Sequence, residues 1–121
     1  MRILIADDDP GMRDILTIFM NRMDYDTDAA ENGIKALDLL GKIPYDVVIT
    51  DGEMPGMTGF ELCRAVRERF PHIFIVGLTG SARLQEFAKA GAHVFYYKPV
   101  QFQMLQKAIE SHFHEQVAPA A

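Results

Sequence analysis

The chain has 121 residues, 49% of them hydrophobic, which suits one domain with a single core and leaves no room for a second. Its formal net charge of −5 argues against direct nucleic-acid binding, because a general binder of phosphate backbones needs a clustered excess of Lys and Arg. The single cysteine excludes an intramolecular disulfide, no apolar run reaches the roughly 18 residues of a membrane span, and no signal-peptide pattern is present, so we expect a cytoplasmic protein.

The first predicted strand is Arg2–Ala6, and a helix follows it. Asp9 is a suitable N-cap for this helix, and Pro10 suits its first position, where a missing N–H costs nothing. Apolar residues then recur at spacings of three and four, which predicts one inward face. That face consists of Met12, Ile15, Leu16, Phe19, Met20 and Met23.

The second predicted strand, Tyr25–Ala29, alternates polar and apolar residues, which favours a place at the edge of a sheet. Asn32 can cap the helix that follows, and Gly41 can end it. The predicted inward residues of this helix are Ile34, Leu37 and Leu40.

The third predicted strand, Asp46–Thr50, stops just before Asp51, where a turn rich in Pro and Gly begins. Thr58, followed three residues later by Glu61, forms a capping box for the third helix. The predicted inward residues of this helix are Leu62, Cys63, Val66 and Phe70.

Two more strand and helix pairs complete the chain. The fourth strand is predicted at Ile73–Leu78, and Ser81 can cap a helix that ends at Gly91. The fifth strand is predicted at His93–Tyr97 and the fifth helix at Gln101–His114. The inward residues of the last helix are Leu105, Ala108 and Ile109.

Strands that alternate with single helices pair in parallel, because each helix carries the chain back to the same end of the sheet. The third and fourth strands are almost continuously apolar, as expected when helices cover both faces. We therefore predict a single α/β domain, a doubly wound five-stranded parallel sheet in the flavodoxin-like order 2-1-3-4-5, with five helices. The domain should cover residues 1–116, and residues 117–121 should be a flexible tail or the start of a linker.

In such sheets ligands bind beyond the carboxyl ends of the strands, at the point where the strand order reverses. That point lies here between the first and third strands. The polar residues just past the strand ends are Asp7, Asp8, Asp51, Thr79 and Lys98. Asp9 also follows the first strand, but its role as a helix cap explains it. We expect the other residues to converge on one crevice.

Three carboxylates at close range repel one another, and a divalent cation removes that conflict. All-oxygen ligands suit Mg²⁺, which binds one or two carboxylates and keeps room for water and a phosphate oxygen. Asp51 is then a nucleophile that can form an aspartyl phosphate, with Asp7 and Asp8 as metal ligands. Lys98 and Thr79 can stabilise the phosphoryl oxygens on the side opposite the metal.

Four motifs stand in order along the chain: ILIADDD, DVVITDGEMPGMTGFEL, GLTGSA and GAHVFYYKPV. Together they resemble the response-regulator receiver family of two-component signalling, whose type member is the bacterial chemotaxis response regulator. The resemblance implies that Asp51 is the phosphoacceptor, supplied by a histidine kinase or a histidine phosphotransfer protein. It also implies that Asp8 binds Mg²⁺ directly, Asp7 mainly through water, and Glu53 through its backbone carbonyl.

The resemblance assigns the remaining site residues as well. Thr79 would donate to a phosphate oxygen, Lys98 would pair with the phosphate, and the bond between Lys98 and Pro99 would be cis. Phe95 occupies the aromatic position that follows the threonine inward, although it lacks the hydroxyl of the commoner tyrosine. The family couples this movement to a surface made of the fourth helix, fifth strand and fifth helix, which would control a protein partner or an attached domain.

Some residues depart from the commonest family pattern. Glu53 adds a fourth carboxylate that either alters metal affinity and phosphate lifetime or is an exposed loop charge. Gly80 leaves the phosphate more open to water or a donor, and Tyr96 and Tyr97 are bulkier than the usual aliphatic residues.

Two other functions remain as alternatives to a switch that catalyses only its own phosphorylation and dephosphorylation. One is a Mg²⁺-dependent phosphohydrolase that uses an aspartyl phosphate, with Glu53 at the offset of its general acid. Its nucleophile would normally follow the first strand, whereas Asp51 follows the third. The other is a receiver-like binding module that is never phosphorylated, against which the complete set of site residues argues.

Overall fold

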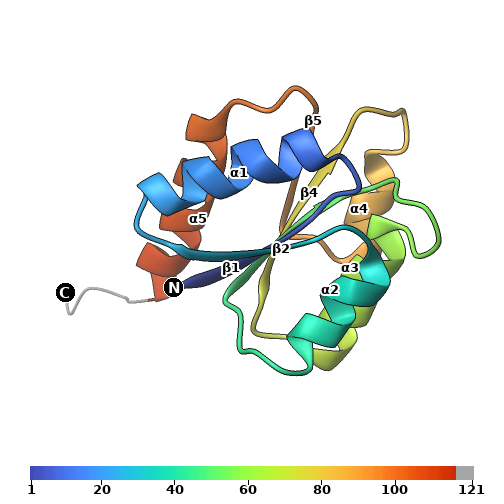
Figure 1. Cartoon of the computed structure of the whole chain (residues 1–121), viewed down its shortest axis with the longest axis horizontal. Coiled ribbons are helices and arrows are strands. Elements are labelled where there is room, and N and C mark those ends of the chain that lie inside the picture. Colours follow the sequence, from blue (N-terminus) through green and yellow to red (C-terminus); the bar gives the residue numbers. More distant parts are fainter. Residues whose placement is uncertain (117–121) are drawn as a thin grey trace.

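Five parallel strands form one sheet in the order β2-β1-β3-β4-β5 (Figure 1). The computed structural model describes residues 1–116, so the tail or linker expected at 117–121 lies outside the described residues. The strands are β1 (Arg2–Ala6), β2 (Asp26–Ala30), β3 (Val47–Asp51), β4 (Phe74–Thr79) and β5 (Val94–Tyr97). The helices are α1 (Pro10–Arg22), α2 (Gly33–Leu40), α3 (Gly59–Arg69), α4 (Gln85–Ala90) and α5 (Phe102–Gln116). The predicted doubly wound architecture is confirmed.

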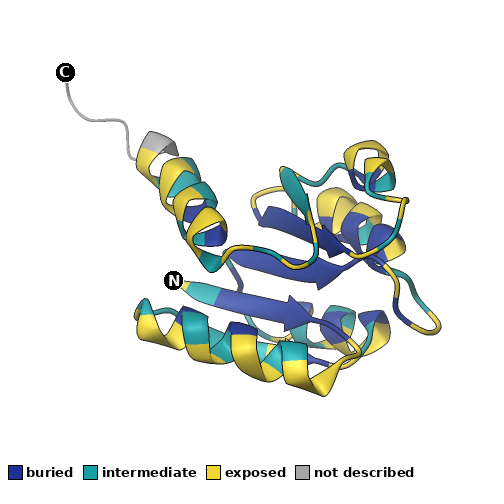
Figure 2. Ribbon diagram, turned by 90° about the horizontal axis from the view of Figure 1, so that it is seen from above, coloured by how far each residue is buried: buried dark blue, intermediate teal, exposed yellow. Residues whose placement is uncertain are grey.

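Helices cover both faces of the sheet. Helices α1 and α5 lie on one face, and α2, α3 and α4 lie on the other (Figures 1 and 2). Successive residues of a strand point to opposite faces, so Ile3 and Ile5 pack towards α1 and α5 whereas Leu4 and Ala6 pack towards α2 and α3. Each fully buried Leu or Ile contributes about 1.5 to 3 kcal/mol, so the sheet and both helical layers stabilise one another.

The strands differ in burial as their sequences predict. Every residue of β3 and β4 is buried, which agrees with their nearly continuous apolar runs. Strand β2 is at the edge, as predicted, and it carries an exposed Asp26 and a half-buried Asp28, charges that discourage pairing with another chain. The most buried strands therefore run through the centre of the sheet, where they end at the predicted site.

Side-chain caps fix the starts of three helices. Asp9 accepts a hydrogen bond from the N–H of Gly11, and Asn32 accepts one from the N–H of Lys35. Thr58 and Glu61 form the predicted capping box of α3. Each cap contributes about 1 kcal/mol and sets the residue at which the helix leaves the loop.

Two of the predicted inward residues are wrong. Ile15 of α1 is 49% exposed and Ile34 of α2 is 62% exposed. In α1 the buried residues are Leu16 and Met20, and Ile15 lies about 100° around the helix from Leu16. The apolar stripe of α1 is thus wider than the face that the sheet covers.

The fourth helix also differs from the prediction. It begins at Gln85, its N-cap residue Leu84 makes no side-chain cap, and the predicted cap by Ser81 is wrong. The hydroxyl of Ser81 contacts Thr79 and accepts from the N–H of Arg83 instead, so the chain turns before the helix begins. Gly91 ends α4 as predicted, in the left-handed conformation at φ 93°.

Some boundaries shift by one residue or more. Asp51 and Thr79 are the last residues of β3 and β4 rather than the first residues after them. Helix α5 extends to Gln116, beyond its predicted end. Within residues 1–116, none of the helices has the length and apolar character needed to cross a membrane.

Candidate functional site

Three carboxylates meet at the carboxyl ends of β1 and β3. Asp7 and Asp8 follow β1, Asp51 ends β3, and the two strands are neighbours in the sheet. One carboxylate oxygen from each residue lies within 4.8 Å of the other two. Asp7 and Asp51 are buried and Asp8 is exposed, so the cluster opens to solvent on the Asp8 side.

A lysine joins two of these carboxylates. The Nζ atom of Lys98, from the loop after β5, lies 3.1 Å from Oδ2 of Asp7 and 3.3 Å from Oδ1 of Asp51. Its backbone N–H donates to the carbonyl of Thr79, which fixes the loop against the end of β4. Burial by itself would lower the pKa of Lys98, but the carboxylates of Asp51 and Asp7 raise it overall. The Lys98–Pro99 bond is cis, as the family resemblance implies.

The charge of Asp51 is only partly compensated. Burial raises its pKa to about 6, while Lys98 lowers it and the neighbouring Asp7 raises it again. The backbone N–H of Glu53 also favours the ionised form by donating to Asp51. A site that leaves one buried carboxylate short of positive charge is suited to a cation.

Backbone hydrogen bonds fix the position of the loop after Asp51. The N–H of Gly52 donates to the carbonyl of Leu78 and the N–H of Gly59 donates to the carbonyl of Gly52, each at 2.8 Å. A Cβ atom on Gly59 would lie 1.6 Å from the carbonyl oxygen of Asp51, so only glycine permits this approach. The start of α3 therefore packs directly against the backbone of Asp51.

Thr79 completes the site from β4, and it is buried. Its hydroxyl lies 3.1 Å from the hydroxyl of Ser81 and accepts from the N–H of Ser81 at the same distance. Next to it, Gly80 is exposed, and a Cβ atom there would meet nothing within 4 Å. The structure thus leaves open the space that a side chain at position 80 would occupy.

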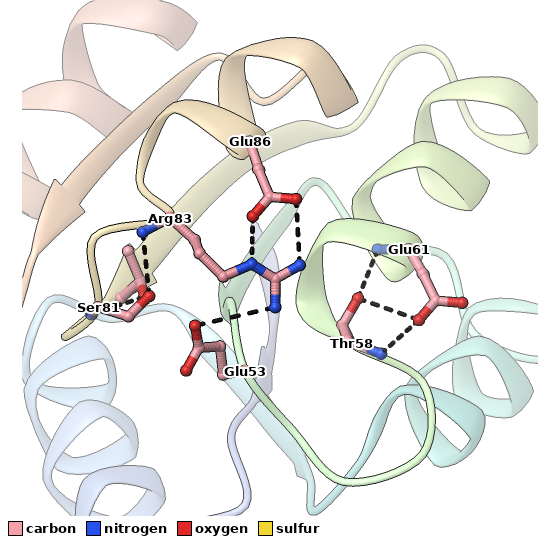
Figure 3. A network of polar contacts seen from close by, with 7 residues as sticks. Glu53, Thr58, Glu61, Ser81, Arg83 and Glu86 are labelled. Carbon is pink, nitrogen blue, oxygen red and sulfur yellow. Dashed lines mark hydrogen bonds and ion pairs between the residues drawn. The ribbon is translucent and has the colours of Figure 1, made fainter.

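Glu53 has a partner that the sequence did not reveal. Its carboxylate is outside the cluster of Asp7, Asp8 and Asp51, and lies 3.9 Å from the guanidinium of Arg83 (Figure 3). Arg83 follows β4 on the loop that leads to α4, so the contact joins two loops distant in sequence. No sequence pattern marks this pair, because it depends on how the two loops fold beside each other.

The three aromatic residues before Lys98 have different surroundings. Phe95 is half-buried and pairs with Gly77 of β4, a residue without a side chain to cover it. Tyr96 packs against the core under α1 and α5, whereas Tyr97 is 56% exposed. The bulk expected to disturb packing beside Lys98 is therefore divided between the core and the solvent.

The donor set fits a hard cation. Asp7, Asp8 and Asp51 offer carboxylate oxygens only, two of them buried and one exposed, and such a set suits Mg²⁺ with water in its remaining positions. A doubly wound α/β domain with this acidic cluster, a lysine and a threonine at its switch point belongs, by fold and site, to the class of phosphoryl-accepting signalling domains.

Comparison with known proteins gives the family. Residues 3–110 match the family described as the response regulator receiver domain, and the chain belongs to this family. It is a receiver domain of the two-component type, a phosphoacceptor switch, and receiver domains are signalling modules.

Similar proteins include both short and long chains. The chain is 38% identical over 119 residues to the chemotaxis protein CheY of Pseudomonas aeruginosa, covering 93% of this chain and 96% of CheY. It is 39% identical over 109 residues to the sensor protein EvgS of Escherichia coli, covering 88% of this chain but 9% of EvgS. Among solved structures, response regulator TrrA of Thermotoga maritima, in complex with Mg²⁺ and BeF, has a TM-score of 0.83 and 32% identity, covering 91% of this chain and 96% of TrrA.

Proposed function

We propose that Asp51 receives the phosphoryl group and that this chain is switched by its gain and loss. The observation that carries the proposal is the convergence of Asp7, Asp8 and Asp51 with Lys98 bridging the two buried carboxylates. Asp51 ends a buried strand, and the start of α3 packs against its backbone. Its carboxylate is therefore positioned in advance as a nucleophile.

A magnesium ion fits the same cluster. Asp8 would bind it directly, Asp7 mainly through water, and Asp51 and the backbone carbonyl of Glu53 would complete the protein ligands. The solved structure of TrrA, a relative in complex with Mg²⁺ and BeF, supports this assignment. When bound, Mg²⁺ neutralises charge on the transferred phosphoryl oxygens.

The reaction needs little from the protein beyond positioning. An oxygen of Asp51 attacks the phosphorus of a phosphohistidine, the P–N bond breaks, and the imidazole nitrogen keeps the electron pair and takes a proton from solvent. Lys98 pairs with one phosphoryl oxygen and Thr79 donates its hydroxyl to another. Hydrolysis by water returns the carboxylate, so the chain acts chemically on itself and turns over no separate substrate.

The donor would be a histidine kinase or a histidine phosphotransfer protein, and α1 offers a place for it to dock. Ile15 and Ile18 are 49% and 53% exposed and line, with Phe19 and Arg22 of the same helix, a groove of about 170 Å³. Phe102 of α5 lines the same groove. Both contributing segments follow site residues in sequence, because α1 begins just after Asp8 and Phe102 comes four residues after Lys98. A donor seated on this groove would lie along the helix that starts just after Asp8 and would reach Asp51 from there.

The output would be a change in a second surface, made of α4, β5 and α5. If Thr79 moved towards a phosphoryl group, it would leave space for the half-buried Phe95 to move inward. Phe95 has no hydroxyl group, so no hydrogen bond from its side chain would hold the inward position. The surface of α4, β5 and α5 carries exposed apolar side chains, among them Tyr97 and Met104. A downstream protein or an attached effector domain would read this surface.

Neither alternative function is favoured. Glu53 would have to act as the general acid of a phosphohydrolase, but its carboxylate pairs with Arg83 and is outside the acidic cluster. A module that is never phosphorylated would have no need of a buried carboxylate beside a lysine and two more acids, an arrangement that is costly to keep.

Intact mass after incubation with acetyl phosphate and MgCl₂ tests the proposal. The wild-type chain should gain one phosphoryl group, and Asp51→Asn should gain none. Addition to Asp51→Asn would assign the acceptor elsewhere, and no addition to the wild type would favour a binding module. Release of many equivalents of phosphate per chain would favour a phosphohydrolase.

A further inference from the structure

The guanidinium of Arg83 contacts three groups. Its Nε and one terminal nitrogen bond the two carboxylate oxygens of Glu86, and its other terminal nitrogen lies 3.9 Å from Glu53 (Figure 3). The guanidinium also lies over the ring of Phe60, 4.8 Å from the ring centre. A guanidinium is a planar fork with five donors, so it can bind two carboxylates along different edges while it stacks on a ring.

The platform under Arg83 is rigid. Phe60 is buried and its ring lies 4.6 Å from that of the buried Phe87. The backbone is also fixed, because the N–H of Arg83 donates to the hydroxyl of Ser81, which in turn contacts Thr79. The ring of Phe60 and the hydroxyl of Ser81 therefore orient Arg83, although its side chain is on the surface.

The contact between Arg83 and Glu53 bears on the proposed metal site because of where Glu53 lies. Its backbone lies at the proposed metal, since its N–H donates to Asp51, yet its carboxylate turns away to Arg83. Without that partner, a flexible and half-exposed glutamate two residues from Asp51 is free to turn towards the cluster of Asp7, Asp8 and Asp51. A fourth carboxylate there would add negative charge beside the cation site.

We propose that Arg83 is a positioning residue that keeps the Glu53 carboxylate out of the acidic cluster, and that it thereby limits Mg²⁺ affinity and prolongs the life of the phosphorylated form. The second effect rests on the proposed function, and the first rests on the cluster itself. A freed Glu53 can accept a proton from a water molecule whose oxygen attacks phosphorus. The bond between phosphorus and the Asp51 oxygen then breaks, and the carboxylate leaves with the electron pair.

Calorimetric titration of the unphosphorylated chain with MgCl₂ alone tests the first effect. Arg83→Gln should bind Mg²⁺ about threefold more tightly than the wild type, a modest factor because charges near solvent are screened. Arg83→Lys keeps the charge but loses the fork, so its affinity should fall between the two. In the Glu53→Gln background the change at Arg83 should have no effect. Arg69→Gln, which removes the same charge from the exposed end of α3, is the matched control.

The phosphoryl lifetime is measured after loading with acetyl phosphate, by removing the donor and following intact mass. Arg83→Gln should lose its phosphoryl group about threefold faster than wild type, and Arg83→Gln with Glu53→Gln should match Glu53→Gln. A change at Arg83 that persists without Glu53, or that equals the effect of Arg69→Gln, overturns the inference. If the wild type cannot be phosphorylated at all, the proposed function fails while the Mg²⁺ titration still decides the role of Arg83.

Discussion

The Nζ atom of Lys98 lies 3.3 Å from Oδ1 of Asp51, although strand β4 separates the strands that lead to these two residues. The same ammonium group lies 3.1 Å from Asp7, so one cation serves two buried carboxylates. The site therefore carries excess negative charge, which the proposed Mg²⁺ would neutralise. Folding stability, metal affinity and the proposed phosphorylation would then be coupled through this one arrangement.

The first prediction concerns Asp51→Asn in the absence of divalent cations. The pKa of Asp51 is raised to about 6 in the folded chain. Protonation of Asp51 therefore adds to folding stability fully below the ordinary aspartate pKa near 4, and this stability is lost as the pH rises through about 6. Asn mimics the neutral form at every pH. The variant should be more stable than wild type at pH 7.5 by about 1 to 2 kcal/mol, less than the shift alone implies because Lys98 loses a partner.

Urea unfolding in EDTA at pH 7.5 and pH 4.5, followed by circular dichroism, checks this result. The gap between Asp51→Asn and wild type should shrink at the lower pH. Added MgCl₂ should stabilise wild type more than the variant, because the variant lacks one ligand. A gap that widens as pH falls would show that burial does not raise the pKa of Asp51.

The second prediction concerns Lys98→Met. Loss of the ammonium leaves Asp7 and Asp51 facing each other, so the metal-free chain should lose about 2 kcal/mol at pH 7.5. Mg²⁺ should bind about tenfold more tightly, because its competitor for the two carboxylates is gone. Calorimetry with MgCl₂ measures the affinity, and Lys98→Arg, which keeps the charge, is the control. Weaker Mg²⁺ binding by Lys98→Met would mean that the lysine supports the metal site instead of competing with it.

The sequence predicts those parts of the fold that depend on neighbouring residues. The caps at Asp9 and Asn32 and the capping box at Thr58 are confirmed because each involves residues two or three positions apart. The meeting of Asp7 with Asp51 also follows, because parallel strands bring their carboxyl ends to one edge whatever the side chains between them.

The parts that the sequence does not predict depend on packing between distant segments. Ile15 and Ile34 fit the helical period as well as their buried neighbours do, and the sheet covers only part of each stripe. The pairing of Glu53 with Arg83 depends on two loops and on the ring of Phe60. Ser81 has the chemistry of a cap, but it contacts Thr79 and the helix starts later.

The third prediction compares two glycines at the site. Gly59→Ala would bring a Cβ atom to 1.6 Å from the backbone carbonyl of Asp51, which neither segment can avoid without moving. It should destabilise the chain by about 3 kcal/mol or prevent folding. Gly80→Ala meets nothing within 4 Å and has no positive φ, so its stability should stay within about 0.5 kcal/mol of wild type. Thermal unfolding of both variants measures the difference, and equal losses would mean that α3 does not pack directly against the backbone of Asp51.

The fourth prediction tests the groove on α1 as the donor's docking site. Ile18→Ser should slow phosphotransfer from a histidine kinase or phosphotransfer protein that phosphorylates wild type by about tenfold, because an apolar contact of this size contributes about 1.5 kcal/mol. Phosphorylation by acetyl phosphate should be unchanged, since a small donor needs no protein surface. The matched control is Ile34→Ser on α2, on the far side of the sheet, where the isoleucine is 62% exposed and lines no part of this groove. Initial rates from both donors, with each variant beside wild type, make the comparison. An equal loss with acetyl phosphate would place the effect in the site itself, and an equal loss in Ile34→Ser would deny the α1 groove any specific part in docking.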